Sequence, residues 1–322
     1  CSRANQNGPE NYGFRGNARN LDLNRDFVKC DSQNAKWFNQ TFNAYNPHMM
    51  IDTHTSNGAD YQYVMTMINT QADKASEPIG NFIREKANPD IYSKMESRGW
   101  GITPYVHTLG RIPDEGIMDF LETPRYSTGY AALFNCIGYT SETHMLKPFA
   151  QRVESTYQFL LATAEFANEN HDEIVELKSQ SDKFVSHQKE FALQWELDTT
   201  QFREILFKGF KAEFPTSEVT GKEQLRYNKN QPFEKKIRFY DHYKPTVLVE
   251  APEAYVIPQA WHEVIERLKW NGVEMFQIKE NQLQELEVYY MHEFESTPSI
   301  YEGHHPNSIK KMDKVDEKIE LR

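Results

Sequence analysis

Apolar residues in the first half of the chain recur at the spacings typical of amphipathic helices. The stretch AKWFNQTFNAY, which follows Asn34, places large apolar side chains three or four residues apart and ends just before Pro47. It therefore predicts a helix. The segment of residues 77–99, EPIGNFIREKANPDIYSKMESRG, predicts one or two further helices, and residues 147–168 predict a long one.

Short apolar runs that end in polar residues alternate with these helices. HMMIDTHTSNG (residues 48–58), YQYVMTMI (61–68) and ALFNCIGYTSETH (132–144) each suit a buried strand. Alternation of this kind predicts an α/β protein with a mixed, mostly parallel sheet and helices on both faces. Ligands of such sheets bind beyond the carboxyl ends of the strands, where His54 and Glu142 are expected to lie.

The pattern changes after about residue 170. A charged stretch (residues 171–195) predicts a helix, and aromatic and β-branched segments follow, namely IRFYDHY, TVLVEAPEAYVIP and VEMFQI. Between the last two, WHEVIERLKWNG predicts a helix that is closed by Gly272. We therefore expect a catalytic-type domain over 1–170, a helical connector over 171–205, and a smaller β-rich α/β accessory domain over 206–322.

Composition and charge narrow the classes of partner. The 322 residues include 47 acidic and 36 basic side chains, a net charge of −11, which argues against nucleic acid as a partner. No apolar run approaches the length of a membrane-spanning helix, so we expect no membrane span. The three cysteines, Cys1, Cys30 and Cys136, lack the spacing of a zinc ribbon and are expected to be buried thiols.

Four short motifs in the first half contain residues that could do chemistry. They are LDLNRDF (residues 21–27), IDTHTSNG (51–58), PRYSTGY (124–130) and YTSETH (139–144). Each alone has a structural explanation: an isolated His is more often hydrogen-bonded than metal-bound, and a glutamate at a strand end can be a cap. Their order along the chain is more informative than any one of them.

In this order the motifs resemble the zinc metallocarboxypeptidases of the carboxypeptidase A type. That family has an Asp followed by Asn-Arg, an acidic or amide residue and an aromatic, matched by Asp22, Asn24, Arg25, Asp26 and Phe27. A helix then leads to a strand that ends in His-Ser/Thr, matched at His54, and a later strand ends in the catalytic Glu, matched by Glu142. The resemblance implies a carboxypeptidase-like fold, peptide or protein C-termini as partners, and secretion or export to a periplasm.

The resemblance implies zinc as the cofactor and assigns a role to each matched residue. A catalytic zinc is held by three protein ligands, of which His54 would be one. Glu142 would take the proton of the attacking water and pass it to the leaving amine. Arg25 and Asn24 would bind the substrate carboxylate, and Asp22 would orient a zinc-bound imidazole.

Two further roles remain open between neighbouring residues. An arginine before Asn-Arg would stabilise the oxyanion, and Arg3 is our choice, with Arg15 and Arg19 as alternatives. The family's mobile tyrosine, which closes over the substrate, matches Tyr130 or Tyr126, and we favour Tyr130 slightly.

The family's remaining two zinc ligands come from a His-x-x-Glu ahead of the Asn-Arg motif, so we expect the chain to begin partway through the domain. His187-x-x-Glu190 and His292-x-x-Glu295 lie in the wrong context and are expected to be solvated charge pairs. The main hypothesis is a zinc metallocarboxypeptidase that hydrolyses the C-terminal peptide bond of peptides, here as a piece that lacks the His-x-x-Glu ligands. The alternatives are a non-catalytic peptide-binding or scaffold protein, or a small-molecule amidohydrolase of the same fold.

Overall fold

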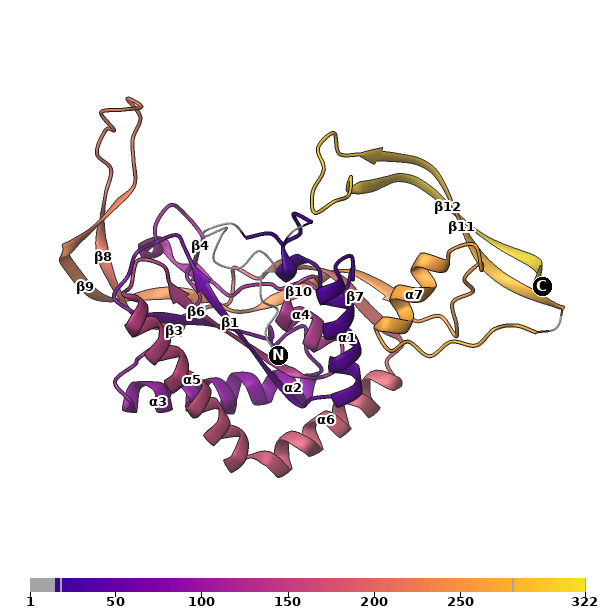
Figure 1. Ribbon diagram of the computed structural model, residues 1–322, viewed down its shortest axis with the longest axis horizontal. Coiled ribbons are helices and arrows are strands. Elements are labelled where there is room, and N and C mark those ends of the chain that lie inside the picture. Colours follow the sequence, from indigo (N-terminus) through magenta and orange to yellow (C-terminus); the bar gives the residue numbers. More distant parts are fainter. Residues whose placement is uncertain (1–14, 18, 280, 322) are drawn as a thin grey trace. The chain divides into compact units, whose positions relative to one another are not determined.

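The computed structural model describes residues 15–17, 19–279 and 281–321. Over these residues the chain is an α/β protein with four small sheets, none of them closed (Figure 1). It packs as two compact units, Cys1–Tyr45 with Val256–Arg322, and Asn46–Tyr255. We call the first the outer unit, because it holds both ends of the sequence, and the second the central unit, because it holds the middle of the sequence. This division is one of packing, and the domain boundaries expected at residues 170 and 205 stay a prediction.

The main sheet of the central unit contains both expected strand tips. Its order is β1 (Met49–Ser56), β6 (Ile137–His144), β2 (Met65–Asn69) and β3 (Thr103–Pro104). The pairs β1–β6 and β2–β3 are parallel, whereas β2 and β6 are antiparallel. The sheet is therefore mixed.

Helices cover both faces of this sheet. On one face Ile137 and Tyr139 pack in the main core with α2 (Glu77–Phe82), η3 (Ile83–Ala87), α3 (Asn88–Ser97) and α5 (Phe149–Glu169), which lie below the sheet in Figure 1. Successive residues of a strand point to opposite faces. On the other face lies α4 (Ser127–Ala132), so close that a Cβ added to Gly138 would be 3.0 Å from Thr128 Cα.

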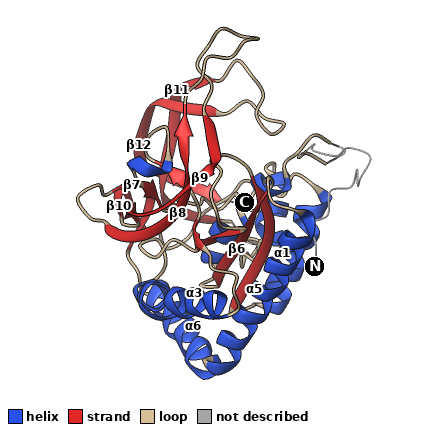
Figure 2. Ribbon diagram, turned by 90° about the vertical axis from the view of Figure 1, so that its left-hand side faces the viewer, coloured by secondary structure: helices blue, strands red, loops and turns tan. Residues whose placement is uncertain are grey.

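The rest of the central unit contains two further sheets, and the four-stranded one contributes to a second, mainly aromatic core. One pairs β7 (Glu190–Leu197) with β10 (Tyr243–Glu250). The other has the order β4 (His107–Thr108), β5 (Ile117–Met118), β9 (Arg226–Tyr240) and β8 (Arg203–Glu213), with the short helix η4 (Pro113–Glu115) nearby. Figure 2 shows α3, α5 and α6 (His171–Ser186) on the opposite side from β7, β8, β9 and β10.

One prediction for this region was wrong. The charged stretch 171–195 was expected to be helical throughout, but α6 ends at Ser186 and residues 190–197 form β7. The sequence EFALQWEL places Phe191, Leu193, Trp195 and Leu197 at every second position, which is the period of a strand. Pairing with β10 then overrides the helical tendency of the charged residues.

The outer unit combines helices from both ends of the chain with one long hairpin. It contains η2 (Leu23–Arg25), α1 (Gln33–Tyr45), α7 (His262–Trp270), and the antiparallel strands β11 (Gln282–Ser296) and β12 (Asn307–Leu321). Asn39 of α1 donates to Asn271 Oδ1 at 2.9 Å, just after α7. As expected, a glycine with a left-handed backbone, Gly272 (φ +76°), closes α7. The expected strand VEMFQI is not formed, because residues 273–278 have no strand partner.

In the described part of the chain, no helix is both long enough and apolar enough to cross a membrane.

Candidate functional site

The two expected strand tips lie side by side in the central unit. His54 of β1 and Glu142 of β6 are direct register partners in the parallel pair. Ile51 and Tyr139 face the main core, so the alternating positions Asp52, His54 and Glu142 point to the face that α4 covers. Neighbouring strands are about 4.8 Å apart. The structure therefore brings together an imidazole and a carboxylate that the sequence separates widely.

The imidazole of His54 has a carboxylate partner on its own strand. His54 Nε2 lies 2.7 Å from Asp52 Oδ2, and both side chains remain partly exposed. In the neutral ring, a proton on Nε2 donated to Asp52 leaves the lone pair on Nδ1. The hydroxyl of Thr143 donates to His54 O at 3.1 Å and holds the backbone at this point. The carboxylate thus selects a tautomer suited to an acceptor or ligand role for Nδ1.

Glu142 is a buried residue, and two residues with hydroxyl groups, Thr66 and Tyr61, lie near it. Its exposed fraction is 9%. Thr66 is its partner on β2, and the Thr66 hydroxyl lies 3.4 Å from Glu142 O. Burial raises the pKa of the nearby Tyr61 to about 12, with the Glu142 charge acting in the same direction. The phenol therefore stays protonated at neutral pH.

The two candidate tyrosines differ in accessibility. Tyr130 lies within α4 with an exposed fraction of 0%, and its ring packs 5.1 Å from that of Phe134. Tyr126 precedes α4, is half-buried, and makes an edge contact with Phe120 at 5.2 Å. A ring that closes over a substrate needs an accessible surface. This geometry favours Tyr126 over Tyr130, although both assignments stay predictions.

The expected carboxylate-binding residues lie in the outer unit, around η2. Asp22 Oδ1 accepts from the backbone N of Asn24 at 2.9 Å and so caps this short helix. Arg25 donates from a guanidinium nitrogen to Asn24 O at 2.7 Å, and the same nitrogen lies 3.9 Å from Asp22 Oδ2. Arg15 also forms an ion pair with Asp22. Asp22 therefore caps η2 and pairs with nearby arginines of its own unit. Its expected role in orienting an imidazole stays a prediction.

The three arginines considered for the oxyanion role differ in whether the structure describes them and in what they contact. Arg3 lies outside the described residues. Arg15 is exposed and pairs with Asp22, whereas Arg19 donates to Asp31 O at 3.0 Å. Both described arginines are thus engaged with groups of the outer unit.

The described residues do not fit the three-ligand zinc site that the resemblance implies. Among them, no group of three or more His, Cys, Asp or Glu side chains is arranged to hold a metal ion. The two His-x-x-Glu segments do not provide one either: His187 follows α6 while Glu190 begins β7, and His292 Nε2 lies 2.9 Å from Asp313 Oδ2. No catalytic step is therefore derived through zinc.

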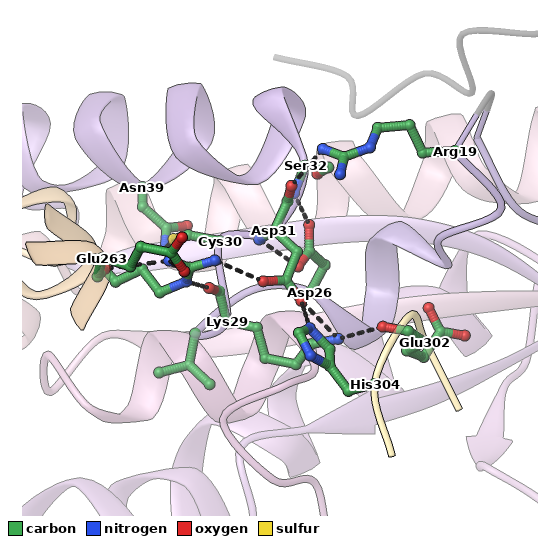
Figure 3. A network of polar contacts seen from close by, with 12 residues as sticks. Arg19, Asp26, Lys29, Cys30, Asp31, Ser32, Asn39, Glu263, Glu302 and His304 are labelled. Atoms are coloured by element: carbon green, nitrogen blue, oxygen red, sulfur yellow. Dashed lines mark hydrogen bonds and ion pairs between the residues drawn. The ribbon is translucent and has the colours of Figure 1, made fainter. Parts of the chain in front are cut away.

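Sequence reasoning missed two groups of polar residues. Asp52 has a local signal, because a residue two positions before His54 on a strand must share its face. The second group surrounds Asp31 in the outer unit, where Arg267 and His304 converge on its carboxylate (Figure 3). No local sequence pattern predicts contacts between residues so far apart in the chain. Cys30 and Cys136, expected to be buried thiols, are buried and form no disulfide with a described residue, and Cys1 lies outside the described residues.

Comparisons with known proteins found no relative. No protein-family model, no curated protein and no solved structure matches this chain. The carboxypeptidase-like part of the expected fold thus stays a prediction, and the functional argument depends on the geometry above.

Proposed function

We propose that this chain carries the proton-transfer part of a hydrolase site of the metallocarboxypeptidase type, which cleaves the C-terminal peptide bond of peptides. The observation that carries the proposal is the placement of His54 and Glu142 as register partners on one face of the sheet. A buried carboxylate beside an oriented imidazole is an arrangement that general acid–base catalysis uses.

Glu142 is the residue to which we assign proton transfer. Its carboxylate would accept the proton of the water that attacks the peptide carbonyl, and would return that proton to the leaving amine. Asp52 would hold the His54 ring in one tautomer throughout.

Recognition of a free carboxylate is proposed for Asn24 and Arg25. Arg25 is mostly buried yet keeps 22% of its side chain exposed, and its guanidinium has five N–H groups to share. A guanidinium of this kind binds carboxylates through paired, charge-assisted hydrogen bonds. This supports peptides, or smaller amides, that carry a free carboxylate as the substrate class.

The test is Glu142→Gln, measured on a peptide with a free C-terminus under conditions where the wild type is active. We expect turnover to fall by at least about 100-fold, since general acid–base catalysis contributes on that scale. Glu122→Gln is a matched control, because Glu122 is another buried carboxyl group of the central unit. It should keep wild-type turnover.

Two outcomes would contradict the proposal. Turnover of Glu142→Gln within a few-fold of wild type removes Glu142 from proton transfer. A wild type that binds such a peptide without cleaving it would instead show a peptide-binding protein.

A further inference from the structure

The turn at the end of the β11–β12 hairpin has an unusual residue in a left-handed backbone conformation. Glu302 has φ +50° and Gly303 has φ +79°, and Tyr301 and His304 exchange two backbone hydrogen bonds of 2.8 and 3.1 Å across them. Two consecutive residues with positive φ define a type I′ turn, whose first position prefers Asn, Asp or Gly. A glutamate there costs about 1 kcal/mol relative to those residues. An outlier of this kind calls for a compensating contact.

Glu302 makes that contact with the segment that carries Arg25. Its Oε2 accepts from the backbone N–H of Asp22 at 2.8 Å, and its carbonyl O accepts from Lys29 Nζ at 3.3 Å. Gly303 lies against Leu21, because a Cβ added to it would be 3.5 Å from Leu21 Cδ2. The side chain of an asparagine, one methylene shorter, would suit the turn but would not reach Asp22.

His304 binds Asp31, which follows Arg25 in the same stretch of the chain. Its Nε2 lies 2.7 Å from Asp31 Oδ2, and Lys29 Nζ is 3.2 Å from the same oxygen (Figure 3). Arg267 of α7 binds the second oxygen, Asp31 Oδ1, at 3.0 Å. Burial would raise the pKa of Asp31, but hydrogen bonds from His304, Arg267 and Lys29 outweigh burial and lower that pKa. The carboxylate is therefore charged at neutral pH.

We infer that Glu302 and His304 are positioning residues for carboxylate recognition by Asn24 and Arg25. The turn forms hydrogen bonds with Asp22 and with Asp31. Between these two residues lies η2, which contains Arg25. The Asp22 N–H that Glu302 binds is one residue before the first residue of η2. Loss of that contact would let the backbone of η2, which carries the Arg25 side chain, move more freely. The carboxylate ligand in this inference rests on the proposed function. The positioning of η2 rests only on the contacts within the outer unit.

The experiment compares two substitutions of one residue. Glu302→Gln keeps the reach and an accepting oxygen, whereas Glu302→Asn favours the turn but loses the reach. Affinity is measured by calorimetry for N-acetyl-phenylalanine and for its amide, beside His304→Ala and Arg25→Ala. Glu295→Ala is the control, because Glu295 also belongs to the hairpin and its carboxylate pairs with the exposed Lys310.

We expect Glu302→Asn and His304→Ala to weaken binding of the free acid by about tenfold, the scale of one lost charged hydrogen bond, at unchanged affinity for the amide. Glu302→Gln and Glu295→Ala should bind like wild type. A role confined to turn stability would give the opposite order, with Glu302→Asn equal to or better than Glu302→Gln. That order would overturn the inference.

The remaining outcomes separate the inference from the proposed function. If Arg25→Ala weakens binding of the acid while Glu302→Asn and His304→Ala do not, the positioning role is wrong and carboxylate recognition stands. If the wild type does not distinguish the acid from the amide, carboxylate recognition fails. Amide hydrogen exchange over Leu23–Asp26 then decides the inference: faster exchange in Glu302→Asn than in Glu302→Gln supports it, and equal exchange overturns it.

Discussion

Asp119 offers a sharp test of how burial affects the stability of the central unit. It follows β5, is 7% exposed, and one carboxyl oxygen accepts from the backbone N–H of Phe120 at 3.1 Å. Burial raises its pKa well above the ordinary 3.8, and the negative charges of Glu122 and Asp241 act in the same direction. The Phe120 N–H and Arg203 oppose these effects but do not cancel them.

The sign and magnitude of the effect follow from linkage. Between 3.8 and the raised pKa, the folded protein holds a proton that the unfolded chain has lost. The free energy of unfolding therefore falls as pH rises through this window, by about 1.4 kcal/mol for each unit of the pKa shift. Asp119→Asn removes the titration and keeps an oxygen for Phe120. We expect this variant to match wild type near pH 4 and to be more stable than wild type near pH 8.

The assay is urea unfolding of wild type and Asp119→Asn at closely spaced pH values between 4 and 8. Asp198→Asn, measured with the pH series extended down to 2, is a control of opposite sign, because hydrogen bonds from Thr200 and Gln201 lower the pKa of Asp198 to about 2. It should lose stability relative to wild type above pH 4, and the difference should shrink as the pH falls toward 2. A difference between Asp119→Asn and wild type that does not change with pH would refute the reasoning.

Three further predictions concern recognition, metal and packing. Arg25→Ala should raise KM for a peptide with a free C-terminus and leave an amidated peptide little affected, because only the free carboxylate loses its partner; equal damage to both would show a structural role. Residues 1–322 should bind zinc weakly and substoichiometrically by metal analysis after dialysis, since the described residues hold no three-ligand cluster; one zinc per chain that His54→Ala removes would contradict this. Phe159→Ala should lower the free energy of unfolding by about 3–5 kcal/mol, because Phe159 is fully buried in the main core, whereas Phe149→Ala on the same helix should change it little, since Phe149 is 72% exposed.

The elements with a clear period could be predicted from the sequence. The apolar spacing after Asn34 gave α1, and the apolar runs with polar tips gave β1 and β6, whose parallel pairing places His54 beside Glu142. The α/β class is confirmed, and the main sheet is mixed. Each of these features depends on local periodicity and on one rule about strand ends.

The errors and omissions have a different origin. Charged residues concealed the two-residue period of 190–197, and the apolar segment 273–278 lacks a neighbouring strand. The contact between His304 and Asp31 joins residues 273 positions apart. The raised pKa of Asp119 likewise depends on burial by the surrounding fold and on the charges of Glu122 and Asp241. Tertiary packing determines such features, and a short stretch of sequence does not predict them.

The parallel pairing of β1 with β6 has a consequence for how the site assembles in time. The register joins residues 88 positions apart, as at Thr55 and Thr143. Closing a loop of that length costs about 4 kcal/mol of chain entropy on top of a constant, before any contact offsets it. Contacts of such long range slow folding. His54 and Glu142 should therefore meet late, after the intervening helices have packed, so that a nascent or partly unfolded chain does not yet hold these two side chains together.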